Sequence, residues 1–79
     1  MTATNGSDYR TRFIREYREL DERIGKLAAM IRRHKAGTLD FTPDSPIELF
    51  ERQLHVMIDY RQILEVRAEN ERIDLTSHR

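Results

Sequence analysis

The feature that most constrains this chain is the spacing of large apolar residues in its first half. They recur at alternating steps of four and three residues, in the order Phe13, Tyr17, Leu20, Ile24, Leu27 and Ile31. In an α-helix such residues line up along one side, and a seam of this kind packs against another helix. The pattern predicts a helix over residues 8–36 with a single apolar seam.

Signals for a chain reversal follow this helix. Gly37 stands where a left-handed helix cap is expected. The loop that follows contains Asp and Pro, and we expect Leu39 and Phe41 to pack back onto the helices. The sequence Ser-Pro-Ile-Glu at residues 45–48 matches a capping box with proline at the first helical position. It predicts a second helix over residues 46–72.

The second helix has two apolar stripes. One stripe consists of Ile47, Phe50, Leu54, Met57 and Leu64, and the other consists of Leu49, Val56, Tyr60 and Ile63. At about 100° per residue the stripes lie roughly 110° apart, so one partner helix covers only one of them. The simplest cover for the second stripe is another copy of the chain.

The expected fold class is therefore all-α. We predict a two-helix antiparallel hairpin that assembles into a homo-oligomeric helical bundle, either a dimer of hairpins or something larger. Residues 1–7 are expected to form a disordered lead, with Ser7 or Asp8 capping the first helix. Residues 8–75 are expected to form one hairpin domain with its loop at 37–45, and residues 76–79 a mobile tail.

Size and charge point to association. A chain of 79 residues buries too little surface to be comfortably stable alone. Residues 1–36 hold nine Lys/Arg against five Asp/Glu (+4), while residues 37–79 hold five against nine (−4). A neutral total argues against a protein that coats DNA, whereas opposed halves suit helices that lie against one another or against copies.

Several classes of protein are not expected. The chain has no cysteine, so disulfides and thiolate metal sites are excluded. Three scattered histidines show no metal-ligand spacing, no apolar run approaches the roughly 18 residues of a membrane span, and Met1 to Ser7 lacks a hydrophobic signal region. Phosphate-loop and nucleophile motifs are absent. We expect a cytoplasmic, non-catalytic protein that needs no metal or cofactor and does not associate with membranes.

Polar residues beside the apolar stripes are the candidate site. Gln53, Tyr60 and Arg67 are spaced seven apart along the second stripe. They either fix the register of packed helices or line a pocket between copies. In a pocket, Tyr60 can stack on a base, Arg67 can grip phosphate and Gln53 can contact a base edge.

A second polar set flanks the seam of the first helix. It consists of Tyr9, Arg12, Glu16, Arg23 and Lys26. These residues either form solvated salt bridges or add cations to an interface where helices cross. Both interpretations are open on the sequence alone.

Around these residues the sequence resembles a family of small phage helical hairpins, known from crAss-like and many other phages. The resemblance lies in Arg12-x3-Glu16-x2-Glu19-Leu20, in Lys26-Leu27 with Ile31, and above all in Gln53-Leu54-x2-Met57-x2-Tyr60-x2-Ile63-Leu64-x2-Arg67. It implies an immune-evasion role, because hairpins of this kind include sponges that sequester the cyclic nucleotide signals of bacterial CBASS defence. The ligand would then lie between protomers in the host cytoplasm, contacted by Tyr9, Arg12, Lys26, Gln53, Tyr60 and Arg67.

Two other functions compete with this one. The apolar second stripe suits a non-catalytic interaction module that docks on a host or phage protein. A long basic helix with Arg12, Arg23 and Lys26 also resembles the all-helical chorismate mutases. Those enzymes use three helices, and this chain offers two.

Overall fold

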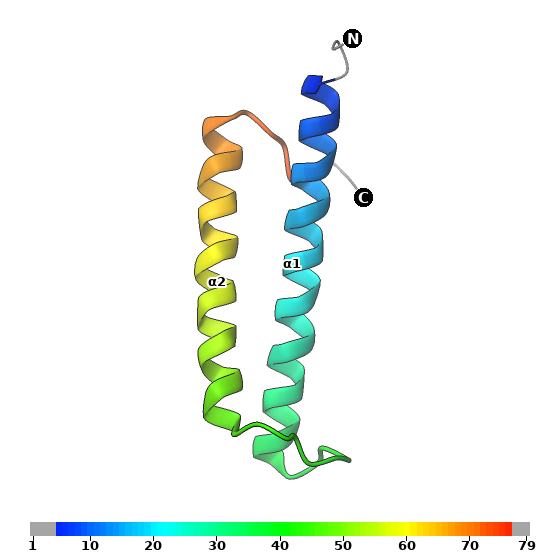
Figure 1. Ribbon diagram of the computed structural model, residues 1–79, viewed down its shortest axis with the longest axis vertical. Helices are drawn as coiled ribbons and strands as arrows, with labels where there is room; N and C mark the ends of the chain where they lie inside the picture. The colour runs from blue at the N-terminus through cyan, green and yellow to red at the C-terminus, as the bar shows by residue number, and fades with distance from the viewer. Residues whose placement is uncertain (1–4, 77–79) are drawn as a thin grey trace.

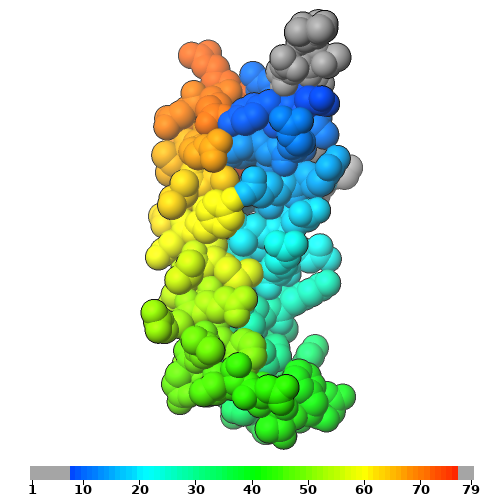
Figure 2. Space-filling model, in the orientation of Figure 1, coloured from blue at the N-terminus to red at the C-terminus, as the bar shows by residue number. Residues whose placement is uncertain are grey.

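The computed structural model describes residues 5–76, which form two long antiparallel helices (Figure 1). Helix α1 spans Asn5–Ala36 and helix α2 spans Ile47–Asn70. The molecule is a rod that measures 52 × 21 × 20 Å. Figure 2 shows the helices packed side by side along its length, with the connecting loop at one end. The predicted all-helical hairpin is confirmed, whereas its assembly into an oligomer stays a prediction.

Helix α1 begins at Asn5, three residues before the predicted start. The helix therefore includes residues 5–7, which were predicted to precede it. The first amide groups of a helix have no helical partner, and small polar residues such as Asn and Ser are favoured there because their side chains can accept from these amides. The expectations for residues 1–4 and 77–79 lie outside the described residues.

The core lies between the helices and is built on the predicted seam of α1. Its buried side chains are Phe13, Leu20, Ile24, Leu64, Ala68 and Ile73, with Ile31 buried farther along α1. Leu64 is fully enclosed, and Tyr17, Leu54 and Met57 pack against the same cluster. Burial of this apolar surface is the main force that holds the two helices together.

Both helices end in the same hydrogen-bonded cap. At the end of α1, the Gly37 amide donates to the His34 carbonyl (3.1 Å) and the Thr38 amide donates to the Arg33 carbonyl (2.9 Å). These bonds form a Schellman motif around Gly37, whose φ is +77°. The left-handed cap predicted at this glycine is confirmed.

The cap of α2 repeats this geometry on an arginine. The Arg72 amide donates to the Glu69 carbonyl (3.3 Å), and the Ile73 amide donates to the Ala68 carbonyl (2.8 Å). Arg72 has a φ of +58°, a conformation that usually requires glycine. Ile73 is only 6% exposed, so its burial beside Ala68 compensates for the strain at Arg72.

The chain after α2 folds back onto the first helix. Figure 1 shows this segment crossing from the end of α2 to α1. Arg10 donates to the Arg72 carbonyl (3.0 Å), and Leu75 packs against the core cluster. The segment therefore closes the end of the core that lies away from the connecting loop.

The capping box predicted at residues 45–48 does not form. Pro46 occupies the N-cap position, with extended backbone angles, and no side chain makes a cap hydrogen bond. Proline has no side-chain acceptor, so the Leu49 amide donates instead to the Pro46 carbonyl (3.0 Å). Glu48 remains in the first turn, where a carboxylate complements the helix dipole.

Polar contacts along one flank set the alignment of the helices. The Tyr17 hydroxyl donates to Glu65 (2.7 Å), Arg61 pairs with Asp21 (2.7 Å), and Lys35 pairs with Glu51 (2.6 Å). The last pair joins the basic half to the acidic half as the charge pattern suggests, whereas Arg61 and Asp21 reverse those signs. The opposite flank is left for the candidate site.

Candidate ligand-binding face

The second stripe of α2 is uncovered in the hairpin. Val56 is 65% exposed, Ile63 55%, Leu49 51% and Tyr60 39%. Residues of the first stripe face α1 and are partly or fully buried, so the predicted division into two stripes is confirmed. We call the row Leu49, Gln53, Val56, Tyr60, Ile63 and Arg67 the outer stripe. Apolar side chains in such a row indicate an interaction surface.

The structure joins two of the predicted site residues at one end of this stripe. Arg67 donates from Nη2 to the Tyr9 hydroxyl (2.8 Å) and from Nε to Glu71 (3.3 Å), and the Tyr9 hydroxyl donates to Glu71 (2.6 Å). The Arg67 guanidinium also lies 5.0 Å from the centroid of the Phe13 ring. Hydrogen bonds and a cation–π contact thus hold this arginine in place beside the stripe.

These contacts also shift the titration of the cluster. The hydrogen bond from Tyr9, and after it the contact with Arg67, holds the pKa of the Glu71 carboxyl below its usual value. The hydrogen bonds to Glu71 and Tyr9 raise the pKa of Arg67. Both side chains are charged at neutral pH, so the cluster presents an ordered cation whose charge is partly balanced by a carboxylate.

The other predicted residues are not drawn into this cluster. Gln53 and Tyr60 are exposed on the outer stripe, and Arg12 is exposed one turn from Tyr9. Lys26 pairs with Glu22 on its own helix (3.6 Å), and its side chain is 77% exposed. A single hairpin therefore assembles Tyr9 with Arg67 but does not bring Lys26 to the outer stripe by any contact described between residues 5 and 76.

Two open hollows lie along the outer stripe. The first measures about 370 Å³ and is lined by Leu49, Arg52, Gln53, Val56 and Met57. The second measures about 330 Å³ and is lined by Gln62, Ile63, Val66 and Arg67. Arg52 and Val66 were not among the predicted site residues. Arg52 lies four residues before Val56 and Val66 lies three residues after Ile63, and this spacing from the second stripe was the signal in the sequence that could have identified them.

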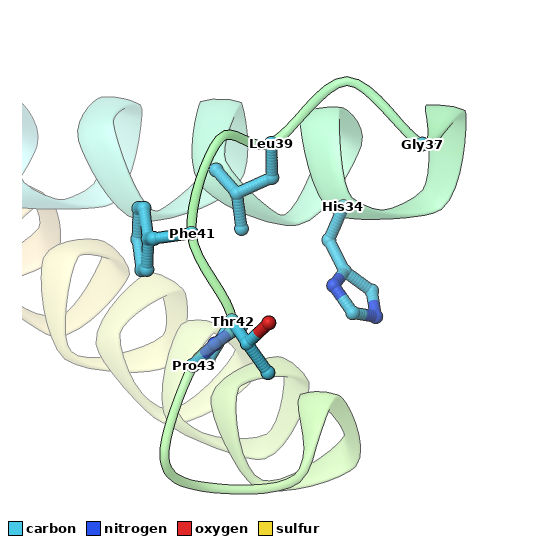
Figure 3. A pocket seen from close by; sticks show the side chains of 6 residues that line it. All are labelled: His34, Gly37, Leu39, Phe41, Thr42 and Pro43. Atoms are coloured by element: carbon cyan, nitrogen blue, oxygen red, sulfur yellow. The ribbon is translucent and has the colours of Figure 1, made fainter.

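A third hollow lies at the other end of the rod, inside the connecting loop. It measures about 230 Å³ and is lined by His34, Gly37, Leu39, Phe41, Thr42 and Pro43. Figure 3 shows the His34 ring between α1 and the loop. The expectation that Phe41 packs onto the helices is wrong, because the residue is 56% exposed and borders this hollow. The backbone around it is bent and irregular, so neither helix directs its ring into the core.

Between residues 5 and 76, no group of three or more His, Asp or Glu side chains lies close enough together to hold a metal ion. Neither of the two helices has a segment long and apolar enough to cross a lipid bilayer.

Comparison with known proteins identifies a family. The sequence model of a family described as Sequestin matches residues 7–70, which include both helices and the connecting loop. Neither the curated proteins nor the solved structures contain a match to the chain. The family's name is consistent with a protein that sequesters a partner rather than one that catalyses a reaction.

Proposed function

The chain belongs to the Sequestin family, and from that premise we propose that it binds and holds a cyclic nucleotide signal of the CBASS type. Its ligand pockets lie between copies of the hairpin, and the protein removes the signal without chemical change. A phage would use such a protein to evade the immunity of its bacterial host.

One observation carries this proposal. The outer stripe places exposed apolar and aromatic side chains next to an arginine that is already held in position by Tyr9, Glu71 and Phe13. A nucleotide offers a flat base and a charged phosphate, which are the two groups that such a surface suits. Tyr60 supplies a face for the base, and the planar fork of Arg67 suits phosphate oxygens. Gln53 adds an amide that can contact a base edge.

A sequestering site needs only binding groups. Tight capture requires cations, a stacking ring and shelter from water, and it requires no nucleophile, general base or metal. Between residues 5 and 76 the chain forms two helices, whereas the chorismate mutases that its basic helix resembles use three. The remaining cations that we predicted, Arg12 and Lys26, reach a ligand only through the packing of copies, because each is exposed on its own hairpin.

Calorimetric titration with cyclic dinucleotides, cyclic trinucleotides and cyclic ADP-ribose isomers tests this function. We expect at least one of these compounds to bind with submicromolar affinity. Denaturing the protein should release that compound chemically unchanged. Tyr60→Ala should weaken that binding about tenfold or more, in line with the loss of one stacking contact. His55→Ala is the matched control, because His55 is exposed on the same helix but outside the outer stripe. No binding of any of these compounds at micromolar concentration would exclude the proposal.

The second candidate function is a non-catalytic helical module that binds a host or phage protein. It is favoured by the four half-exposed apolar residues of the outer stripe, which suit a partner helix. It predicts a chain that is monomeric or loosely dimeric when purified, with its stripe open to the partner. Light scattering distinguishes the two functions, because a stable closed oligomer leaves no stripe free.

A further inference from the structure

The two hollows of the outer stripe occupy matching positions on either side of the middle of α2. We propose that two copies pair antiparallel through their α2 helices, so that the first hollow of each copy faces the second hollow of the other copy. The result is two identical composite pockets, each with Arg52 and Gln53 from one copy and Ile63, Val66 and Arg67 from the other. This inference rests on the pockets between copies in the proposed function and states how they are built.

The register follows from the residues of the stripe. A twofold axis level with residue 58, with Asp59 next to it, sets Leu49 opposite the second copy's Arg67, Gln53 opposite its Ile63, and Val56 opposite its Tyr60. These pairs are the alternating layers of an antiparallel coiled coil, and the axis makes every contact occur twice. All four half-exposed residues of the stripe are covered in this register, and Val66, itself 51% exposed, is covered by Arg52 of the second copy.

Other arrangements cover the stripe less well. In a parallel pair, Arg67 of one copy faces Arg67 of the other, so that two cations repel each other. An antiparallel register shifted by one heptad pairs Arg52 with Asp59, but it leaves Ile63 and Val66 beyond the end of the second helix. Exposed ion pairs contribute little, whereas half-exposed Ile and Val side chains gain from burial in proportion to their apolar area. The proposed register is therefore the most stable of the three, although it brings the two Asp59 carboxylates near each other.

The composite pocket selects an anion that carries a flat apolar group. Arg52 and the second copy's Arg67 bring two guanidinium groups to one site, and Glu71 balances only the latter. Phosphate between them relieves the repulsion of the two cations. Tyr60 of the second copy lies at the inner edge, next to Val56. The hollows of about 370 and 330 Å³ are open in one hairpin and become enclosed when they face each other.

Cross-linking tests the pairing without any ligand, because the chain has no cysteine and single cysteines can be placed at will. With a short bismaleimide, Asp59→Cys should link to itself at the axis. Leu49→Cys should not link to itself, since the two Leu49 positions stand about 27 Å apart along an antiparallel pair. His55→Cys, outside the stripe, is the control for random collision. Self-linking of Leu49→Cys, or no link from Asp59→Cys above the His55 control, overturns the antiparallel pairing.

Mixing two variants tests the composite pocket with the cyclic nucleotide that binds best in calorimetry. Arg52→Gln and Arg67→Gln should each lower affinity about ten- to hundredfold, as expected when a charged hydrogen bond is lost. A refolded mixture should regain full affinity in about a quarter of its sites, because half of the random dimers carry one pocket with both arginines. Ile63→Ser replaces Arg67→Gln if that variant is poorly folded. A mixture that regains nothing places both arginines in a site within one copy and overturns the composite pocket.

The two experiments also distinguish this inference from the proposed function. Cross-linking at Asp59 together with no nucleotide binding rejects the function and retains the pairing. Nucleotide binding together with parallel or absent cross-links retains the function and rejects the pairing.

Discussion

At the scale of single residues, hydroxyl groups of tyrosines connect the helices on both flanks. Tyr17 donates to Glu65 on one flank, and Tyr9 donates to Glu71 on the other. Each bond joins a residue of α1 to a residue far away in sequence, which lies on α2 or at its C-terminal cap. Folding shifts the pKa of Tyr17 and the pKa of Glu71 through these bonds, so each bond predicts an effect of pH.

Tyr17 should make stability fall at alkaline pH. Burial, and after it the hydrogen bond and charge of Glu65, raises the pKa of Tyr17 from 10.0 to about 12. The unfolded chain ionises first, so this contribution is complete below pH 10 and is lost as pH rises towards about 12. Urea unfolding over this range should show a steeper loss for the natural chain than for Tyr17→Phe, which cannot ionise. Parallel pH profiles for the two proteins would contradict the role of Tyr17.

Tyr9 should control the titration of Glu71. The hydroxyl of Tyr9 is the largest cause of the lowered pKa of Glu71, so Tyr9→Phe should move that pKa up towards its usual value. The lowered pKa favours folding above the usual value near 4.5, and this contribution is lost as pH falls through the folded pKa. Carboxyl-carbon NMR measures the shift directly. Tyr60→Phe is the matched control, and an unchanged Glu71 titration in Tyr9→Phe would show that the hydroxyl is not its cause.

At the scale of elements, the two helix caps provide a natural comparison. Both are Schellman motifs, but one uses Gly37 and the other Arg72 at the left-handed position. A left-handed conformation costs a residue with a β-carbon about 1–2 kcal/mol, whereas glycine adopts it freely. The two caps should therefore respond in opposite ways to substitution.

Arg72→Gly should stabilise the hairpin by up to about 1 kcal/mol, after allowance for the greater freedom of glycine in the unfolded chain. The Arg72 carbonyl that accepts from Arg10 is retained in this variant. Thermal unfolding followed by circular dichroism measures the change. A lower melting temperature would mean that the Arg72 side chain contributes more than its backbone strain costs.

Gly37→Ala should destabilise the hairpin by about 1–2 kcal/mol. A β-carbon at this position meets no atom within 4 Å, so the loss reports backbone strain alone. Gly25→Ala is the matched control, because this site is equally open and lies inside α1, where alanine is the better helix former. If both variants gain stability, the cap at Gly37 is not held in the left-handed conformation.

At the scale of the whole molecule, the outer stripe decides whether the hairpin is complete. Val56 is 65% exposed in one copy, so Val56→Glu should change the stability of an isolated hairpin by no more than about 0.5 kcal/mol. In an oligomer the same change buries a charge, and we expect a clear fall in melting temperature and dissociation in light scattering. His55→Glu should leave both unchanged. A monomer whose melting temperature is the same for Val56→Glu and the natural chain would contradict the predicted oligomer.

Local signals in the sequence determined the secondary structure and the face on which each helix is buried. The seam from Phe13 to Ile31, the glycine at 37 and the two stripes of α2 are all recovered. Helical periodicity is a property of neighbouring residues, so it can be read without knowing the fold. The ends of the helices were less certain, since the cap at Pro46 and the start at Asn5 depend on small differences in local energy.

Only the tertiary structure decided which polar residues meet. Tyr9 lies 58 residues from Arg67 in sequence, and nothing in either segment reveals their hydrogen bond. The same is true of Ile73 and of the strained Arg72, which are set by the return of the chain to α1. Contacts between distant segments depend on the rotation and alignment of whole helices, and these are fixed by packing across the core rather than by any local pattern.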